Sequence, residues 1–238
     1  MSNSADGTPV ATARTTEEAV ADYQAKLHEF EELRRGVENF FRLRPALNQR
    51  PFPLIHSIKS RVKDPKHLAE KIRRKKERDG TIVTVDNLYS EITDLCGVRV
   101  MHLHQSQFPR IHEEIKEKVE SGDWTLAEAP IAYSWDPEAS EFYGNQLGFR
   151  VKIKESYYTS IHYLVKPRPD GYLCCEVQVR TLFEEAWGEI DHAINYPDKT
   201  KSVACREQLK VLAKLVSTGT RLAEAIFTVH DNEKQSNP

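Results

Sequence analysis

The segment EVQVRT constrains the fold of this chain more than any other stretch, because it defines both faces of one strand. Alternate side chains of a strand share a face, so Val177 and Val179 are expected to point into a core. The opposite face then carries a carboxylate, an amide and a guanidinium, from Glu176, Gln178 and Arg180. Such a face suits a binding site, although a solvated edge strand would show the same pattern.

A helical pattern follows this strand directly, with Thr181 as a suitable N-cap. Apolar residues then recur at helical spacing, at Phe183, Ala186, Trp187, Ile190 and Ile194. Open α/β folds place ligands where a strand ends and a helix begins. The junction therefore predicts an α/β protein with a candidate ligand site at the carboxyl end of this strand.

A length of 238 residues suits one α/β domain with helical extensions. A helix start at Thr15 or Thr16 opens an amphipathic pattern that lasts to about Arg44. We expect a mixed sheet of about five strands flanked by helices. The expected division is a disordered segment 1–14, a helical extension 15–50, a central domain 51–200, a C-terminal helix 201–230 and a tail 231–238.

Within the central domain, Asp64 as N-cap, Pro65 behind it and Gly80 as a stop bound a predicted helix. Further helical segments are expected at 54–59, 85–92, 107–120 and from Thr181 to about Tyr196. Strands are expected at 96–103, 124–133, 148–155, 157–167 and 172–180, with a loop at 134–147.

No apolar run approaches the roughly 20 residues that span a bilayer, and the N-terminus lacks a hydrophobic signal core. We therefore expect a cytoplasmic protein without membrane contact. The four cysteines show neither zinc spacing nor a disulfide framework. A net charge of −2 argues against a surface coated with basic residues for long nucleic acids.

Positive charge is nevertheless concentrated in one stretch, RVKDPKHLAEKIRRKKER. On the predicted helix, Lys71, Arg74 and Lys75 fall near one exposed flank. Arg61 and Lys63 project from the segment that enters this helix. A merely solvated helix face is the alternative, but the scarcity of compensating acids favours phosphate binding.

Polar residues also stand in and beside the predicted strands. Asp94 immediately precedes a strand, which suits a divalent metal site, although a turn carboxylate would look the same. Asp94 and Glu176 could share a Mg²⁺ ion that arrives with substrate phosphates. Arg99 lies inside an apolar strand, where a buried guanidinium needs partners.

The segment YYTSIHYLVKP puts Tyr158, Ser160 and His162 on one strand face. This face offers a ring that can stack on a base, together with hydrogen-bond donors. A half-exposed sheet face would show the same pattern. No glycine-rich P-loop occurs, so phosphate chemistry of that class is excluded.

These segments together resemble a known family. RVKDPKHLAEK, ITDLCGVRV, YYTSIH and EVQVRT with its AWGEIDHAINYP continuation are similar, in order and spacing, to the synthetase domain of RelA/SpoT homologues. The resemblance covers about residues 50–200. Because segments similar to the hydrolase and regulatory domains are missing, the chain resembles the stand-alone small alarmone synthetases of this family. It implies a nucleotidyltransferase-like fold and Mg²⁺-dependent transfer of the β,γ-pyrophosphate of ATP to the 3′-hydroxyl of GTP or GDP, releasing AMP.

The resemblance implies roles at matching positions on the ATP side. Arg61 and Arg99 would sandwich adenine, and Lys63 and Lys71 would hold the ATP phosphates. Asp94 would bind Mg²⁺.

On the acceptor side, the resemblance implies that Tyr158 would stack on the base. Glu176 would bind metal or help to activate the 3′-hydroxyl. The remaining acceptor contacts would come from Ser160, His162, Gln178 and Glu185.

The chain departs from the family pattern in three places. Tyr157 stands where family members often have Gly, His67 replaces a frequent Ser, and Glu185 stands where some synthetases carry Asn. A carboxylate at the last position suits guanine N1–H and N2–H, but it also accepts from the exocyclic amine of another base. The acceptor therefore stays open between GTP or GDP, an adenine nucleotide, and the 3′ CCA end of tRNA as in toxin-type relatives.

The same departures leave the partners open. A toxin-type protein would have a neutralising antitoxin, and the apolar stripes of the terminal helices suit a homo-oligomer. A further alternative is a catalytically silent nucleotide-binding regulator, against which the presence of both Asp94 and Glu176 counts.

Overall fold

The computed structural model describes residues 15–196 and 198–236, so the expected disorder of 1–14 lies outside the described residues. Its centre is a seven-stranded mixed sheet with strand order β1-β2-β7-β6-β4-β5, and β3 pairs with β6 off this path. The strands are β1 Ser57–Val62, β2 Cys96–His102, β3 Thr125–Leu126, β4 Ile131–Ser134, β5 Arg150–Ile153, β6 Ser160–Lys166 and β7 Cys175–Thr181.

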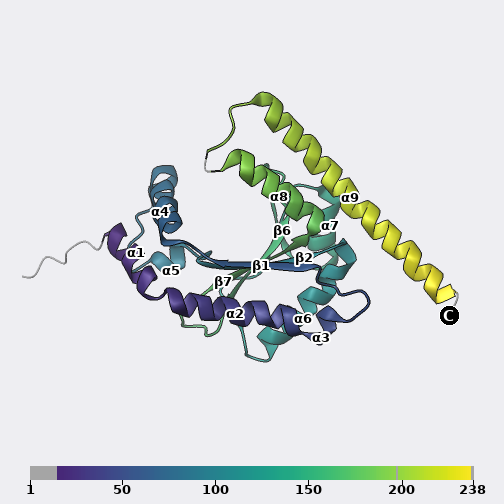
Figure 1. The fold of residues 1–238 in the computed structure, drawn as a ribbon, viewed down its shortest axis with the longest axis horizontal. Helices are drawn as coiled ribbons and strands as arrows, with labels where there is room; N and C mark the ends of the chain where they lie inside the picture. Colours follow the sequence, from purple (N-terminus) through teal and green to yellow (C-terminus); the bar gives the residue numbers. More distant parts are fainter. Residues whose placement is uncertain (1–14, 197, 237–238) are drawn as a thin grey trace, which may run out of the picture.

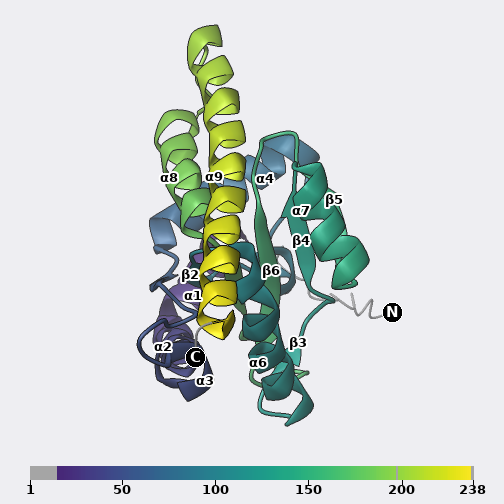
Figure 2. The ribbon, with the colours of Figure 1, turned by 90° about the vertical axis from the view of Figure 1, so that its right-hand side faces the viewer.

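Helices cover both faces of this sheet (Figures 1 and 2). The helices are α1 Thr16–Ala25, α2 Leu27–Leu43, α3 Pro45–Asn48, α4 Pro65–Asp79, α5 Leu88–Glu91, α6 Phe108–Glu120, α7 Pro137–Glu141, α8 Leu182–Asn195 and α9 Val203–Ser236, with short η1 Gln105–Gln107 and η2 Phe142–Gln146. In Figure 1, α2 and α6 lie below the sheet, and α8 and α9 lie above it. None of the described helices is both long and apolar enough to cross a membrane.

The hydrophobic core lies between the sheet and the layer of α2 and α6. Val177 and Val179 of β7 are fully buried there, as the alternation in EVQVRT predicts. Phe30 of α2 and Phe108 of α6 are among the largest buried side chains of this core. The opposite face of β7 is therefore free to carry polar groups toward α8.

Helix starts and stops follow the predicted signals. Thr15 and Glu18 form a reciprocal capping box at the start of α1. Asp64 caps α4 by accepting from the backbone N–H of Lys66, and Gly80 ends that helix at φ 72°. Thr181 caps α8 through a second capping box with Glu184. These local rules were sufficient because each depends on residues within one turn.

Two predicted elements were wrong. The segment 54–59 was expected to be helical, but Ser57–Val62 is strand β1, which pairs antiparallel with β2. The pairing partner, about 40 residues away in the chain, decides this conformation, and a short apolar run does not reveal it. The expected loop 134–147 instead contains α7 and η2, because Asp136 caps the backbone N–H groups of Glu138 and Ala139.

Three further boundaries differ from the expectation. The segment 124–133 splits into β3 and β4, and with the unexpected β1 the sheet has seven strands rather than about five. The first helical stretch breaks at Lys26 into α1 and α2. Helix α9 continues to Ser236, through most of the expected tail. The mixed α/β class with helical extensions is confirmed.

Helix α8 turns its polar side to the sheet and its apolar side to α9 and to solvent. Trp187 is buried, but Phe183, Ile190 and Ile194 are each more than 40% exposed. Helix α9 carries a further exposed apolar stripe, consisting of Val211, Leu215, Leu222, Ile226 and Val229. The self-association that this stripe suits stays a prediction.

The first turn of α8 gives a pH-dependent prediction. Burial raises the pKa of Glu184 from 4.5 to about 7, so the folded state binds more protons than the unfolded state between these values. Stability is therefore lost as pH rises through this window, by at most about 3 kcal/mol. Glu184→Gln keeps a capping side chain and removes the partly buried charge. We expect it to raise the melting temperature at pH 8 by several degrees and to change it little at pH 5.

Thermal unfolding followed by circular dichroism at the two pH values measures this difference. Glu155→Gln, an exposed position outside α8, is the control and should change neither value. An equal effect of Glu184→Gln at both pH values would contradict the proposed cost of ionising this carboxyl.

Candidate active site

Strand register places the predicted site residues in rows across the polar face of the sheet. Arg61 of β1 pairs with Gly97 of β2, which pairs with Glu176 of β7. Because Gly97 has no side chain, a space opens between Arg61 and Glu176, and all three line one hollow of about 300 Å³. A second row runs from Lys59 through Arg99 and Gln178 to His162.

The site was expected at the carboxyl end of β7, but it lies across the polar face of the sheet. Glu176 stands near the start of β7, and α8 folds back over the sheet from the far end of that strand (Figure 1). The rule for open α/β folds describes strands flanked by parallel neighbours. Here β7 lies between a parallel β2 and an antiparallel β6, and its polar side chains face α8 along its whole length.

Glu176 is the centre of a continuous hydrogen-bond network. Its Oε1 lies 3.1 Å from His162 Nδ1, and its Oε2 accepts a 2.6 Å hydrogen bond from Gln178 Nε2. His162 Nε2 lies 2.8 Å from the Tyr158 hydroxyl, so in the tautomer that carries its proton on Nδ1 the ring donates to Glu176 and accepts from Tyr158. Gln178 Oε1 in turn accepts from Arg99 Nε at 3.1 Å.

This network sets the charge of Glu176. Burial alone would raise its pKa, but the hydrogen bonds from His162 and Gln178 outweigh burial, and the pKa of Glu176 is lowered from its usual value. Glu176 is therefore an anion at neutral pH. A carboxylate with a lowered pKa is a good metal ligand and hydrogen-bond acceptor and a weak general base.

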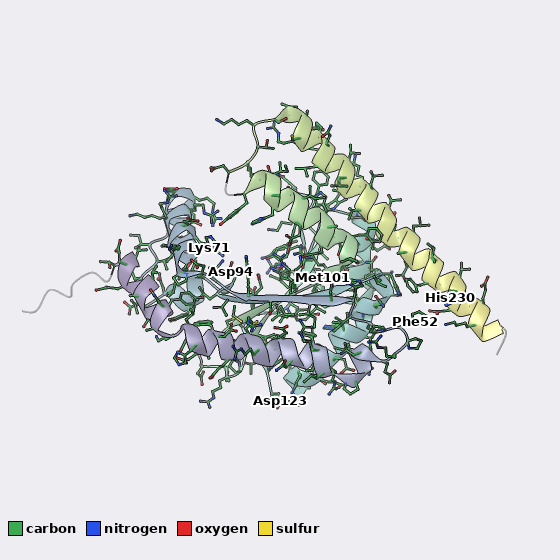
Figure 3. All side chains as sticks on the ribbon, viewed as in Figure 1. Phe52, Lys71, Asp94, Met101, Asp123 and His230 are labelled. Carbon is green, nitrogen blue, oxygen red and sulfur yellow. The ribbon has the colours of Figure 1, made fainter. Side chains whose placement is uncertain are left out.

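Asp94 lies just before β2 and is held by two lysines. Its oxygens lie 3.0 Å from Lys63 Nζ and 2.7 Å from Lys71 Nζ. Figure 3 shows Lys71 of α4 beside Asp94, with Met101 at the far end of the same strand. Burial raises the pKa of Asp94, but the two ammonium groups outweigh it and the pKa is lowered. Lys63 is mostly buried, and burial lowers its pKa.

The donor set of this region suits Mg²⁺ that arrives with a nucleotide. Asp94 and Glu176 line the same hollow. They are close enough for the charge of Asp94 to oppose part of the lowering of the Glu176 pKa. Within the described ranges, no cluster of three or more His, Cys, Asp or Glu side chains forms a metal cage. Mg²⁺ commonly takes one or two carboxylates and completes its shell with water and phosphate oxygens. Two carboxylates beside two lysines fit this arrangement.

Glu185 occupies a different environment from the one expected for a free base-reading carboxylate. It is 4% exposed and lies 2.7 Å from Arg180 Nη2, 2.9 Å from Lys59 Nζ and 3.3 Å from Arg99 Nη1. Burial raises the pKa of Glu185, but these three cations together lower it. Glu189, one turn later, also contacts Arg99 at 2.8 Å. The carboxylate is thus neutralised by cations from β1, β2 and β7.

Gly188 allows Arg180 to approach α8 closely. A Cβ atom at this position would lie 2.9 Å from Arg180 Nη1. Arg180 is 2% exposed, and its guanidinium lies 5.6 Å from the centre of the Tyr158 ring. The glycine in AWGEI therefore makes room for a buried arginine that supports Tyr158.

Three adjoining hollows of about 300, 430 and 290 Å³ share residues and form one cleft. The structure brings most predicted site residues to it, namely Arg61, Asp94, Arg99, Tyr158, His162, Glu176 and Gln178. Lys63, Lys71 and Glu185 line none of the three hollows, but each forms an ion pair with a residue that does, either Asp94 or Arg99. Ser160 is the exception, because it is fully buried, lies against the carbonyl of Val179 and lines none of the three hollows.

Sequence reasoning missed several residues of this cleft. Helix α8 contributes Glu189, Asp191, His192 and Asn195, and Tyr196 follows at its C-cap. Tyr133 and Lys154 line the third hollow. Lys154 Nζ lies 4.4 Å from the centre of the Tyr133 ring. A signal existed in α8, because Glu185, Glu189 and His192 recur at helical spacing opposite its apolar stripe.

Tyr157 explains one departure from the expected pattern. It has φ 63°, a left-handed conformation that glycine adopts without strain and that costs other residues of order 1–3 kcal/mol. The structure therefore keeps, at this position, the backbone geometry that a glycine would allow. Tyr158 is consequently placed in the cleft as expected.

The sheet and the charged cleft define a mixed α/β protein with a polar site between the sheet and α8. A GTP pyrophosphokinase family protein from Streptococcus pneumoniae has the same fold, with a TM-score of 0.62 and 20% identity over 93% of this chain and 97% of that chain. Small alarmone synthetase 1 from Bacillus subtilis gives a TM-score of 0.61 and 19% identity over 90% and 97%. The same synthetase bound to its product pppGpp gives 0.61 and 20% over 90% and 97%.

The sequence itself assigns the family. Residues 60–201 match the region found in RelA / SpoT proteins, and the chain therefore belongs to the RelA/SpoT family. No curated protein sequence matches the chain.

Proposed function

We propose that this protein is a Mg²⁺-dependent alarmone synthetase that transfers the β,γ-pyrophosphate of ATP to the 3′-hydroxyl of GTP or GDP and releases AMP. The observation that carries the proposal is the placement of Glu176 and Asp94 in one hollow, flanked by cations from β1, β2 and α4. Membership of the RelA/SpoT family supports the same reaction class.

The residues of this chain would divide the work as follows. Arg61 and Arg99 line the hollow from adjacent strands and would hold the adenine between them. Lys63 and Lys71 would neutralise the ATP phosphates, and Mg²⁺ held by Asp94 and Glu176 would stabilise charge on the transferred group. Because its pKa is lowered, Glu176 would orient the 3′-hydroxyl mainly by accepting a hydrogen bond from it. It would be only a weak base for removing the proton of that hydroxyl.

The acceptor would lie on the α8 side of the cleft. Tyr158 lines two of the three hollows and would stack on the base, while His162 and Gln178 would position the ribose or phosphates. Glu189 and Asp191 give this wall negative charge, which suits the hydrogen-bonding edge of a base better than a polyanionic backbone.

A second candidate is pyrophosphorylation of the 3′ CCA end of tRNA. Helix α4 favours it, because the exposed Lys66 and Lys76 have no carboxylate within ion-pair distance in the part of the chain that the structure describes. Such cations suit a phosphate backbone. An adenine nucleotide acceptor would need no such surface.

A transfer assay separates these candidates. Purified protein is incubated with γ-labelled ATP, Mg²⁺ and, in turn, GDP, GTP, ATP or deacylated tRNA. We expect label on GDP and GTP and release of AMP. The matched variant Lys66→Gln with Lys76→Gln should leave this transfer unchanged, since neither side chain lines the cleft.

The other outcomes are also decisive. Label on tRNA alone, together with loss of tRNA labelling in the double lysine variant, would show that the protein pyrophosphorylates tRNA instead of GTP or GDP. Label on ATP alone would indicate an adenosine alarmone. Transfer to none of the four acceptors would support a catalytically silent nucleotide-binding regulator.

A further inference from the structure

A second cavity lies on the other side of α8 from the cleft. It has a volume of about 220 Å³ and is enclosed by the start of α7, the first turns of α8 and the middle of α9. Trp187 is in the walls of both spaces. Consecutive glutamates face different sides, since Glu184 lines this cavity and Glu185 pairs with the cations of the cleft. The proposed reaction uses none of the groups considered next.

Two aromatic side chains form one wall of the cavity. Trp135 and Tyr157 have ring centroids 4.9 Å apart at an interplanar angle of 59°, and both remain partly exposed. Tyr157 keeps its ring there despite its left-handed backbone, which glycine would adopt without strain. Residues held in such conformations concentrate at ligand sites. The wall offers aromatic faces on which a flat molecule can stack.

The polar groups of the cavity include an unsatisfied donor. Gln105 lines it, and the buried Nε2 of this side chain has no hydrogen-bond partner among the described residues. A buried amide without a partner costs free energy, and turning this side chain toward the cavity would let a ligand acceptor recover it. Glu184 presents its carboxyl nearby, with one oxygen 2.7 Å from the Thr181 backbone nitrogen. An amide and a carboxyl together match the mixed donors and acceptors of a heterocyclic edge.

The charges exclude phosphate as the main anchor. Arg221 is the sole lysine or arginine among the residues that line the cavity, and it lies 3.1 Å from Asp136 and 3.1 Å from Glu138. With Glu184 the wall holds three acidic side chains against one paired cation. Phosphate would therefore meet repulsion without a free counter-charge.

We propose that this cavity is a second ligand site that takes an uncharged or cationic planar heteroaromatic molecule, of the class of nucleobases and nucleosides without phosphate. The ring stacks on Trp135 and Tyr157, and its polar edge accepts from Gln105. The site is distinct from the cleft because α8 stands between the two, with Trp187 as the shared wall.

Site-specific fluorine NMR tests the proposal on the full chain labelled with 5-fluorotryptophan. Adenosine, guanosine and cytidine are titrated in turn, and we expect at least one to shift the Trp135 resonance saturably. Trp124 is an internal control, because it packs against Phe40 under the opposite face of the sheet. Its resonance should not move.

Two variants assign the site. Gln105→Leu should weaken the Trp135 titration at least tenfold, and so should Tyr157→Gly, which removes the ring where glycine adopts the observed backbone without strain. Gln178→Leu, the matched amide change in the cleft, should leave the titration unchanged.

Three results would overturn the proposal: no saturable Trp135 shift at millimolar nucleoside, an unchanged titration in both pocket variants, or tighter binding of AMP, GMP or CMP than of the nucleosides. None of them involves catalysis. Failure here would leave the proposed pyrophosphate transfer intact, and failure of that transfer would leave this site intact.

Discussion

Glu176→Gln should lower the rate of pyrophosphate transfer by about 10²–10⁴-fold while leaving the protein folded. The substitution keeps the shape of the side chain and removes the negative charge that His162 and Gln178 hold in the cleft. Without this charge, Mg²⁺ loses one of its two proposed carboxylates and the acceptor hydroxyl loses its hydrogen-bond acceptor. Label transfer from γ-labelled ATP under single-turnover conditions measures the effect on the chemical step.

A matched control is Glu120→Gln, which removes an exposed carboxylate at the end of α6, outside the cleft. It should retain the full rate. Circular dichroism of both variants checks the fold. If Glu176→Gln keeps more than about a tenth of the transfer rate, Glu176 is not the central acidic group of the reaction.

Glu185→Gln should destabilise the fold by about 3 kcal/mol, because Arg180 is 2% exposed and loses its only carboxylate partner among the described residues. Lys59 and Arg99 would still have Glu189. A loss of this size corresponds to a melting temperature lower by roughly 6–12 °C. Urea unfolding measures it directly, with an unchanged slope as the sign that only stability has changed.

Glu189→Gln is the matched control, one turn away on the same face of α8. Its side chain is 51% exposed, so removing its ion pairs should cost no more than about 1 kcal/mol. Arg180→Met in the Glu185→Gln background should recover part of the lost stability, since no unpaired buried charge remains. Equal effects of the two glutamate variants would refute the structural role of Glu185.

This result would also bear on acceptor recognition. A carboxylate already bound to Arg180, Lys59 and Arg99 has few free lone pairs for a guanine edge. A change in acceptor preference in Glu185→Gln, beyond its loss of stability, would show that one of these ion pairs opens when the acceptor binds.

The parts of the fold that depend on neighbouring residues were predictable from the sequence. Thr15, Asp64 and Thr181 mark helix starts through caps that act within one turn, and the alternation of Val177 and Val179 shows which face of β7 is buried. Strand β1 was not predictable in the same way, because its conformation depends on pairing with β2. Helix propensity and a short apolar run carry no information about a distant partner.

The site shows the same division. Strand patterns and the resemblance located Asp94, Arg99 and Glu176, which the structure brings together. Ser160 has the correct strand parity but lies buried outside the cleft. Parity fixes the face of a residue but not which helix covers that face. On α8, the sequence assigned only Glu185 to the site, although the polar side of the helix faces the cleft and Ile190 and Ile194 face solvent.

The two edge strands of the described sheet also affect how copies of this protein can meet. Strand β1 ends the sheet on one side with exposed Lys59 and Arg61, and β5 ends it on the other with Arg150 and Lys152. Positive side chains on an edge strand oppose backbone pairing with a second sheet, which is the usual first step of strand-mediated aggregation. Association of two copies through pairing of their edge strands is therefore disfavoured.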